Sequence, residues 1–168
     1  MARVNGERVV LSLGSNLGDR EATLRAGVDA IVALDGVAPV AASGLVETPA
    51  LKPHGVDLDA PAYLNAVLIV TSTAEPEELL VSLNDIERSL GRERDERWGD
   101  RTLDIDIVVW GSRSLATETL TIPHPRAASR AFVLAPWLEV DPSAELPEGP
   151  VAALLTEQPT RYPAGALL

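Results

Sequence analysis

The chain has no cysteine, which excludes disulfide bonds, thiolate catalysis and thiolate metal sites. Long apolar runs are also missing, because stretches such as 66–70 and 107–110 are far too short to cross a bilayer. The first eight residues are polar, and the apolar run behind them breaks at Gly14, which does not resemble a secretory signal. We therefore expect a cytoplasmic protein that does not associate with membranes.

Lysine occurs once, as Lys52, and the chain has neither a Walker A loop nor the glycine fingerprint of dinucleotide-binding folds. The net charge of -11 argues against a nucleic-acid binder, whose affinity rests on basic residues. The length of 168 residues and the 46% hydrophobic content fit one globular domain. We expect residues 1–168 to form that domain, with 141–168, rich in proline, as a loosely packed C-terminal wrap.

The apolar pattern predicts a βαββαβ order of elements. Strands are expected over residues 8–13, 40–47, 63–72 and 103–110, and helices over about 20–34 and 76–90. This order is typical of an antiparallel, ferredoxin-like α/β sheet (α+β) with both helices on one face, which leaves the second face free for a ligand. Residues 14–18 are expected to form the turn after the first strand, and residues 50–62 are expected to form a loop. Additional C-terminal elements are expected: a short strand over 115–122, a turn of helix over 129–137 and another over 151–155.

Two carboxylates, Asp104 and Asp106, stand one residue apart in the last predicted strand. Strand side chains alternate between faces, so both aspartates point one way, while the opposite side faces a core through Leu103, Ile105 and Ile107. A divalent cation such as Mg²⁺ would turn their repulsion into coordination, often shared with substrate phosphates. Taken alone, such a pair is more often a solvated edge strand with surface aspartates.

Arginine is concentrated next to this pair, which favours the metal and phosphate interpretation. Of the 14 basic residues 13 are arginine, and five fall within 14 positions before the aspartates: Arg88, Arg92, Arg94, Arg97 and Arg101. Guanidinium groups meet phosphate oxygens as planar forks. Favourable interaction of basic residues with the dipole at a helix C-terminus would explain Arg88 and Arg92, but hardly all five arginines. An acidic chain with such a cluster is expected to bind a small polyanion.

A histidine and several aromatic residues complete the candidate site. His124 lies between two prolines, which fix its backbone, and Arg126 and Arg130 follow it; a lone loop histidine is otherwise usually incidental. Only six aromatic residues occur, and Tyr63, Trp98 and Phe132 lie near polar motif residues, a placement that suits sandwiching a flat heterocycle. On spacing alone, Tyr63 and Phe132 could equally be plain core.

Taken together, these segments resemble the 6-hydroxymethyl-7,8-dihydropterin pyrophosphokinase family of folate biosynthesis. The resemblance runs through residues 11–18, 47–49, 63–67, 86–88, 90–92, 97–99, 101–107, 122–126 and 130–134. It implies a ferredoxin-like α/β sandwich. It also implies transfer of the pyrophosphoryl group of ATP to the hydroxymethyl oxygen of the pterin, with release of AMP. We expect these two substrates as its partners, no nucleic acid or membrane partner, and a monomer.

The resemblance also assigns roles to residues. It implies that Asp104 and Asp106 hold two Mg²⁺ ions that bridge the ATP phosphates, and that Arg92 and Arg101 join them as catalytic residues. The implied ATP-binding residues are Glu87, Arg92, Arg101, Ile107, Thr121, His124 and Arg130. The implied pterin-binding residues are Thr48, Pro49, Leu51, Tyr63, Asn65, Trp98 and Phe132. Trp98 is expected to belong to a lid that closes over both substrates and excludes water.

Some positions depart from the family. Thr119 stands where some members carry an arginine, Pro125 replaces an aromatic residue, and the segment containing Arg94 varies. No general base is evident, so either aspartate could take the hydroxyl proton, or metal coordination alone could lower the pKa of the hydroxyl. Two other functions remain open: a regulatory ligand-binding module on the same type of sheet, and a metal-dependent phosphohydrolase.

Overall fold

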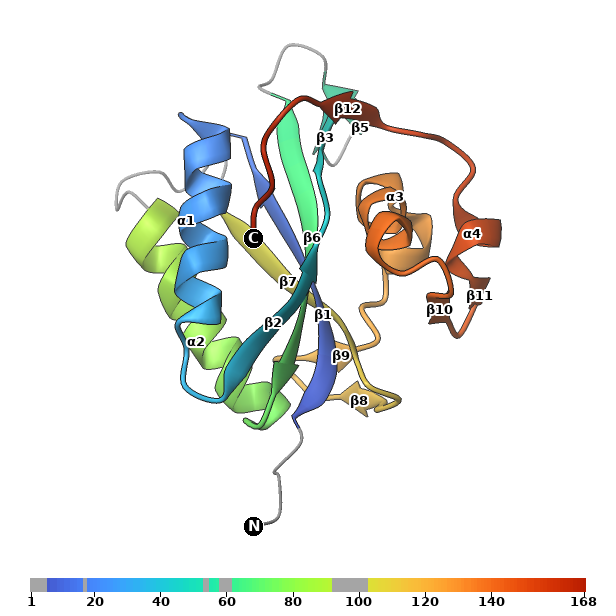
Figure 1. The fold of residues 1–168 in the computed structure, drawn as a ribbon. Helices are drawn as coiled ribbons and strands as arrows, with labels where there is room; N and C mark the ends of the chain where they lie inside the picture. Colours follow the sequence, from blue (N-terminus) through green and yellow to red (C-terminus); the bar gives the residue numbers. More distant parts are fainter. Residues whose placement is uncertain (1–5, 17, 53–54, 58–61, 92–102) are drawn as a thin grey trace.

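The computed structural model describes residues 6–16, 18–52, 55–57, 62–91 and 103–168. Its centre is a six-stranded sheet in the order β12-β3-β6-β1-β7, with β2 also paired to β6 (Figure 1). The strands are β1 (Glu7–Ser15), β2 (Val37–Ala42), β3 (Leu45–Thr48), β6 (Tyr63–Ser72), β7 (Asp104–Trp110) and β12 (Thr160–Tyr162). All pairs are antiparallel, and the order β3-β6-β1-β7 confirms the predicted ferredoxin-like arrangement.

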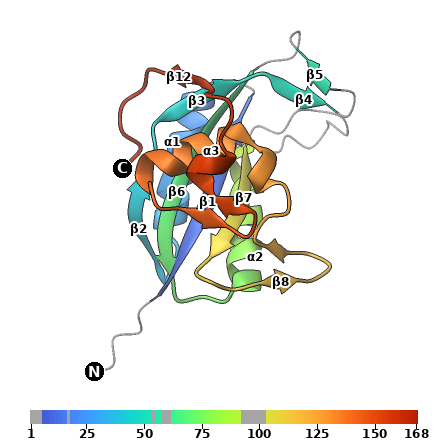
Figure 2. The same ribbon diagram turned by 90° about the vertical axis from the view of Figure 1, so that its right-hand side faces the viewer.

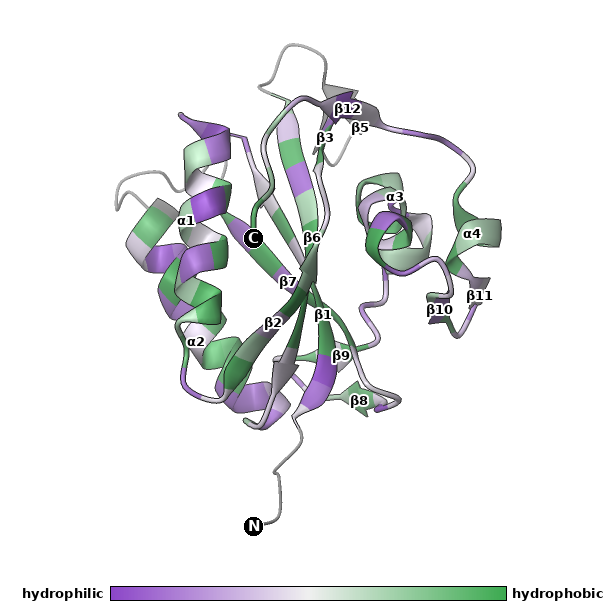
Figure 3. Cartoon of the chain, viewed as in Figure 1, coloured by the Kyte–Doolittle hydropathy of each residue, from purple (hydrophilic) through white to green (hydrophobic). Residues whose placement is uncertain are grey.

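Helices cover both faces of the sheet. On one face lie α1 (Arg20–Val32) and α2 (Pro76–Gly91), and on the other lie η1 (Ala127–Ser129), α3 (Ala131–Val140) and α4 (Val151–Leu154), as Figures 1 and 2 show. Apolar residues are prominent along the central strands and α3, whereas α1 and α2 contain both polar and apolar residues (Figure 3). The expectation that the second face stays free is therefore wrong for the part beneath α3.

The alternation of strand side chains produces two hydrophobic cores. The core between the sheet and the first two helices contains, among others, Leu11, Leu13, Leu24, Val28, Ile31, Leu64, Leu68, Leu79, Leu83, Ile105 and Ile107. The core beneath α3 contains Val10, Val67, Ile69, Val108, Val133, Leu134 and Trp137. The helical stripes predicted from apolar spacing are the buried ones. The N-cap of α1 also follows the prediction, since the Asp19 side chain accepts a hydrogen bond of 3.1 Å from the backbone of Ala22.

The second predicted strand is divided in two. It becomes β2 and β3, both paired with β6, and the break falls at Ser43 and Gly44. The Ser43 backbone N–H donates to the Val67 carbonyl at 2.9 Å, and the Val67 N–H donates to the Ser43 hydroxyl at 2.8 Å. A side-chain oxygen thus replaces a backbone acceptor and bridges the irregularity, which lets one long strand serve two short partners.

Three further boundaries differ from the expectation. β1 continues through Gly14 to Ser15, so that the glycine lies inside the sheet instead of in a turn. Residues 50–62, expected to be a loop, include the paired strands β4 (Ala50–Lys52) and β5 (Gly55–Asp57). Residues 115–122 form a hairpin, β8 (Leu115–Ala116) and β9 (Thr121–Ile122), instead of a single strand. Thr117 and Thr119 in this hairpin each donate a hydrogen bond of 2.9 Å to Glu77 at the start of α2.

The C-terminal segment, expected to be a loosely packed wrap, has mostly exposed side chains but contains regular elements. After α3 it forms the hairpin of β10 (Glu145–Leu146) and β11 (Gly149–Pro150), then α4, and then β12, which pairs with the outer edge of β3. Leu146 and Val151 are buried in the same core as α3, and Leu167 is buried in the core on the opposite side of the sheet, which includes residues of α1. The tail thus passes around the β3 edge from one core to the other (Figure 1).

No helix within the described ranges is both long and apolar enough to span a membrane.

Candidate active site

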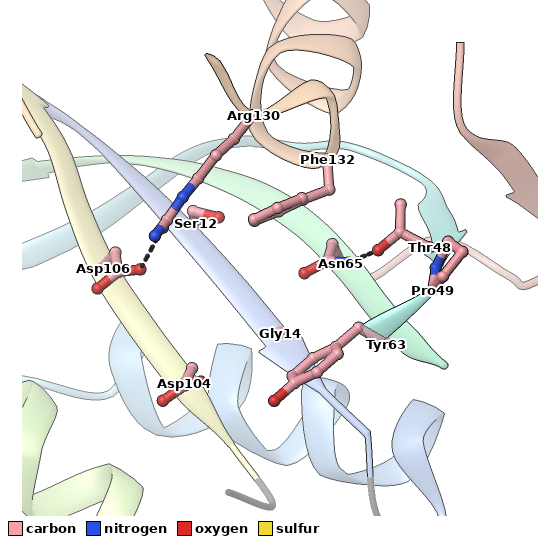
Figure 4. A pocket seen from close by; sticks show the side chains of 10 residues that line it. All are labelled: Ser12, Gly14, Thr48, Pro49, Tyr63, Asn65, Asp104, Asp106, Arg130 and Phe132. Atoms are coloured by element: carbon pink, nitrogen blue, oxygen red, sulfur yellow. Dashed lines mark hydrogen bonds and ion pairs between the residues drawn. The ribbon is translucent and has the colours of Figure 1, made fainter. Parts of the chain in front are cut away.

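Two adjoining cavities open on the sheet face that α3 only partly covers. The smaller has a volume of about 190 Å³ and is lined by Ser12, Gly14, Thr48, Pro49, Tyr63, Asn65, Asp104, Asp106, Arg130 and Phe132 (Figure 4). The larger, of about 410 Å³, is lined by Asp104, Asp106, His124, Pro125, Arg126 and Arg130. Three charged residues are common to both cavities: Asp104, Asp106 and Arg130. A ligand in one cavity would therefore reach the boundary of the other.

The register of the three central strands places small residues on the cavity floor. Gly14 lies opposite both Asn65 and Asp104, and Ser12 lies opposite Asp106. Sequence reasoning did not assign Ser12 or Gly14 to the site. The available signal was the alternation along β1, in which Val10, Ser12 and Gly14 share one face and become progressively less bulky toward the site.

The aspartate pair has the arrangement that the strand pattern predicts. Asp104 and Asp106 point to the cavities, while Ile105 and Ile107 are buried in the opposite core. Their Cα atoms lie roughly 6.6 Å apart along the strand. Asp106 Oδ2 is 3.7 Å from Arg130 Nη1, and the Asp106 side chain is 47% exposed.

The chemistry of these donors fits a hard divalent cation. Within the described part of the chain no group of three or more histidine, aspartate or glutamate residues is placed to hold a metal. Two carboxylates are too few for a closed protein cage. They suit Mg²⁺, which is commonly held by one or two carboxylates and completes its coordination with water and substrate phosphate.

His124 is fixed by its backbone and its ring. Its N–H donates to the Val108 carbonyl at 2.8 Å, which ties the loop to the strand that carries the aspartates. The backbone N–H of Arg126 donates to His124 Nδ1 at 3.1 Å. Because a backbone amide is always a donor, Nδ1 must accept, and the proton of the neutral ring therefore resides on Nε2. Nε2–H is then available to donate to an anionic ligand.

The pKa of His124 is lowered from 6.5, first by burial and then by Arg130 and Arg126, while Asp106 opposes the shift. We expect an NMR titration of the histidine ring protons to place the His124 midpoint below 6.5, and the Asp106→Asn variant to lower it further. Since the unfolded ring binds protons more readily, this residue should destabilise the fold as pH falls below 6.5.

The chain has two histidines, so the titration is carried out in a His54→Gln background, in which every histidine ring signal belongs to His124. A midpoint that rises in Asp106→Asn would contradict the proposed proximity of the ring and the carboxylate.

Arg130 stands at the junction of η1 and α3. Its carbonyl accepts hydrogen bonds from Val133 at 2.9 Å and Leu134 at 3.0 Å, which fixes the residue as the start of the helix. Its guanidinium group lies over the Phe132 ring, with Cζ 5.5 Å from the ring centre, and extends toward Asp106 (Figure 4). A cation in this position serves both the aromatic cavity and the charged one.

The smaller cavity has the shape and chemistry of a slot for a flat ring. Phe132 enters it from α3 and Tyr63 from β6, on opposite sides, and Asn65 lies between them (Figure 4). Asn65 is buried, and its Nδ2 donates to the Thr48 hydroxyl at 3.0 Å. With the amide in this orientation, Oδ1 is the acceptor presented toward the slot (Figure 4). Aromatic faces with one oriented amide suit a polar heterocycle.

Several predicted site residues lie elsewhere or outside the described residues. Glu87 on α2, Ile107 in the helix-side core and Thr121 on β9 line neither cavity. Leu51 belongs to β4, and its side chain is outside the described structure. Arg92, Trp98 and Arg101 lie outside the described residues altogether.

Comparison with known proteins gives consistent matches. The family model of 7,8-dihydro-6-hydroxymethylpterin-pyrophosphokinase (HPPK) matches residues 10–142. A 2-amino-4-hydroxy-6-hydroxymethyldihydropteridine pyrophosphokinase of Mycobacterium tuberculosis is 45% identical over 165 residues, covering 89% of this chain and 83% of that protein. The Bacillus subtilis protein of the same name is 40% identical over 130 residues, covering 77% of this chain and 75% of that protein.

Solved structures show the same fold. The Plasmodium falciparum HPPK-DHPS wild type aligns with a TM-score of 0.64 at 14% identity, covering 92% of this chain and 41% of that one. A mutant of the same protein, solved with pterin and p-hydroxybenzoate, aligns with a TM-score of 0.68 at 14% identity, covering 92% and 44%. The chain thus spans less than half the length of these solved chains. At this identity the likeness supports the fold alone.

Proposed function

This chain belongs to the 7,8-dihydro-6-hydroxymethylpterin-pyrophosphokinase family, whose reaction is pyrophosphate transfer in folate biosynthesis, and we propose that its two joined cavities hold the two substrates. The pterin occupies the aromatic slot, and the ATP phosphates occupy the charged cavity. The observation that carries this assignment is the shared boundary of Asp104, Asp106 and Arg130. The hydroxymethyl oxygen and the phosphate chain meet there, as in-line transfer requires.

In the slot, Phe132 and Tyr63 stack on the two faces of the pterin, and Asn65 reads its edge. The acceptor Oδ1 takes a hydrogen bond from a ring N–H, while Thr48 keeps the amide in this orientation. Pro49 lines the slot beside them, and Leu51 belongs to the same proposed group. Burial makes this recognition selective, because a ligand without the matching donor leaves a buried acceptor unpaired.

In the charged cavity, His124 and Arg130 bind the phosphate oxygens, and we add Arg126 because its side chain lines the same cavity. The guanidinium groups form charge-assisted hydrogen bonds, and His124 donates from Nε2. Arg92 and Arg101 at the phosphates, Trp98 in the lid, and Glu87, Ile107 and Thr121 near ATP remain proposals that rest on the resemblance. Thr119 bonds to Glu77, so its side chain is already engaged away from the cavities.

We propose that Asp104 and Asp106 hold Mg²⁺ together with the phosphate oxygens. Bound there, the metal supplies Lewis-acid stabilisation of the charge that develops on the transferring group. In the reaction, the hydroxymethyl oxygen forms a bond to the β-phosphorus and the bond from that phosphorus to the α–β bridging oxygen breaks, releasing AMP. We propose that the hydroxyl proton passes to one of these two carboxylates, because both line the two cavities.

A quenched incubation with ATP, Mg²⁺ and 6-hydroxymethyl-7,8-dihydropterin tests this function. We expect AMP and pterin diphosphate in equal amounts. Formation of ADP would indicate an ordinary kinase, and consumption of ATP without a pterin product would indicate a phosphohydrolase. Tight pterin binding that is indifferent to ATP and Mg²⁺, without turnover, would indicate a regulatory module instead.

We also propose that the enzyme acts as a monomer in the cytoplasm, without nucleic acid or membrane partners. Sedimentation velocity is expected to give one species with the mass of a single 17.8 kDa chain. A concentration-dependent dimer would contradict the monomer.

The missing side chain at Gly14 leaves the space that the Asn65 amide oxygen occupies. A Cβ atom at Gly14 would lie 2.8 Å from Asn65 Oδ1 and 3.5 Å from a Tyr63 ring carbon. Gly14→Ala is therefore expected to displace the amide oxygen and raise the pterin KM by about tenfold, with the ATP KM little changed.

The matched control is Gly44→Ala, which also adjoins β6. Its Cβ would meet only the flexible carboxylate of Glu139, at 3.3 Å. Equal pterin KM values for the two variants would show that Gly14 has no special role in the slot.

A further inference from the structure

We propose that the C-terminal tail and Arg20 form a support that holds the pterin slot in its binding geometry from the opposite face of the sheet. The support consists of Arg20, Glu47, Ala62 and Tyr162. None of these residues lines either cavity. The inference rests on the proposed function, since it concerns the slot assigned above to the pterin.

Arg20 joins the two strands that carry the slot. Its Nη1 donates to the carbonyl of Ala62 at 2.8 Å and lies 2.8 Å from Glu47 Oε2. Ala62 immediately precedes Tyr63, and Glu47 immediately precedes Thr48. One guanidinium group therefore binds the neighbours of two slot residues on two adjacent strands.

The strand geometry transmits this contact to the slot. In the register of β3 and β6, Glu47 is opposite Leu64 and Thr48 is opposite Tyr63. Since successive side chains alternate, Glu47 points to the α1 side while Thr48 points into the slot, where it orients Asn65. A shift of β3 along β6 would move the Thr48 hydroxyl away from the Asn65 amide. Arg20 opposes that shift from the α1 side of the sheet, because it binds both Glu47 and Ala62.

The tail completes the support. β12 pairs with the outer edge of β3, Thr160 opposite Glu47 and Tyr162 opposite Leu45, so that β3 is an internal strand instead of an edge. The Tyr162 ring lies against the Arg20 guanidinium, with the ring centre 5.7 Å from Cζ. The Arg20 side chain is accordingly only 23% exposed, and its ion pair with Glu47 is partly shielded from solvent.

Arg25 provides a matched comparison on the same helix. Its Nη1 and Nη2 donate to the carbonyls of Ala166 at 2.7 Å and Gly165 at 2.9 Å, so it too anchors the tail. Its ion-pair partner is Glu21, in the same helix. Arg25 therefore shares the tail-binding function of Arg20, but among the described residues it has no hydrogen bond or ion pair with the strands of the slot.

The test compares Arg20→Gln with Arg25→Gln in the full-length enzyme. We expect Arg20→Gln to raise the pterin KM, and the pterin Kd measured by calorimetry, by about tenfold with the ATP KM within twofold. Arg25→Gln is expected to leave both KM values within twofold of the wild type while lowering the melting temperature as Arg20→Gln does. Arg20→Lys keeps the charge near Glu47 and should recover part of the pterin affinity.

An unchanged pterin Kd in Arg20→Gln, or equal increases of pterin Kd in both glutamine variants, would overturn the proposal. Tyr162→Ala leaves Arg20 in the chain but removes the ring that lies against its guanidinium group. It is also expected to raise the pterin Kd, so the proposal can still be tested if Arg20→Gln does not fold. Calorimetry separates this inference from the proposed function. A wild type that binds pterin but makes no pterin diphosphate would contradict the function alone.

Discussion

Asp106→Asn is expected to lower kcat by roughly 10³-fold while leaving the fold intact, because the substitution removes about 4 kcal/mol of charge stabilisation in the transition state. Asparagine keeps the size of the side chain and loses its charge. Asp106 lies on the cavity face and is 47% exposed, so no core packing depends on it. The expected signature is a fall in kcat at saturating substrates with an unchanged melting temperature.

Asp85→Asn is the control for a general effect of charge. Asp85 lies on the exposed side of α2 and pairs only with Arg88 among the described residues, at 3.1 Å. Its substitution should leave kcat within twofold of the wild type, as expected of an exposed ion pair. Wild-type kcat in Asp106→Asn would remove the basis for a metal at this position.

Arg130→Gln is expected to lower kcat/KM by roughly 10²-fold for both substrates. The guanidinium group lines both cavities, lies 3.7 Å from Asp106 and rests on the Phe132 ring. Its loss removes a phosphate contact and also removes the cation that rests on Phe132 in the wall of the pterin slot. Steady-state kinetics with each substrate varied in turn will separate the two effects.

Arg161→Gln is the matched control. Arg161 is 81% exposed, lines neither cavity and pairs with Glu139 at 3.8 Å. Arg161→Gln should leave kcat/KM for both substrates unchanged. A normal kcat/KM for ATP in Arg130→Gln would show that this arginine does not contact the phosphate chain.

The central sheet and the direction of the aspartates follow from local pattern. Asp104 and Asp106 alternate with apolar residues, and a strand has only two faces, so their shared direction needs no tertiary information. The stripes of Leu24, Val28 and Ile31 in α1 likewise follow from helical spacing. Wherever one face of an element is buried, local periodicity was sufficient to predict which of its residues form that face.

The remaining features depend on long-range pairing. Gly14 belongs to the slot because β1 lies between β6 and β7, which places it opposite both Asn65 and Asp104. The division of β2 and β3 depends on the Ser43 hydroxyl bonding to Val67, a partner 24 residues away. The packing of the tail depends on the free edge of β3, which no local signal in residues 160–162 indicates. Such contacts form only when the sheet assembles, so they cannot be predicted from local sequence patterns.

The most direct test of the account is the fate of the individual phosphates of ATP. With ATP labelled separately at the α, β and γ positions, Mg²⁺ and 6-hydroxymethyl-7,8-dihydropterin, the account predicts that the β and γ labels both appear in the pterin product and that the α label remains in AMP. Transfer of the γ label alone with formation of ADP, or release of the β and γ labels as free pyrophosphate, would contradict it.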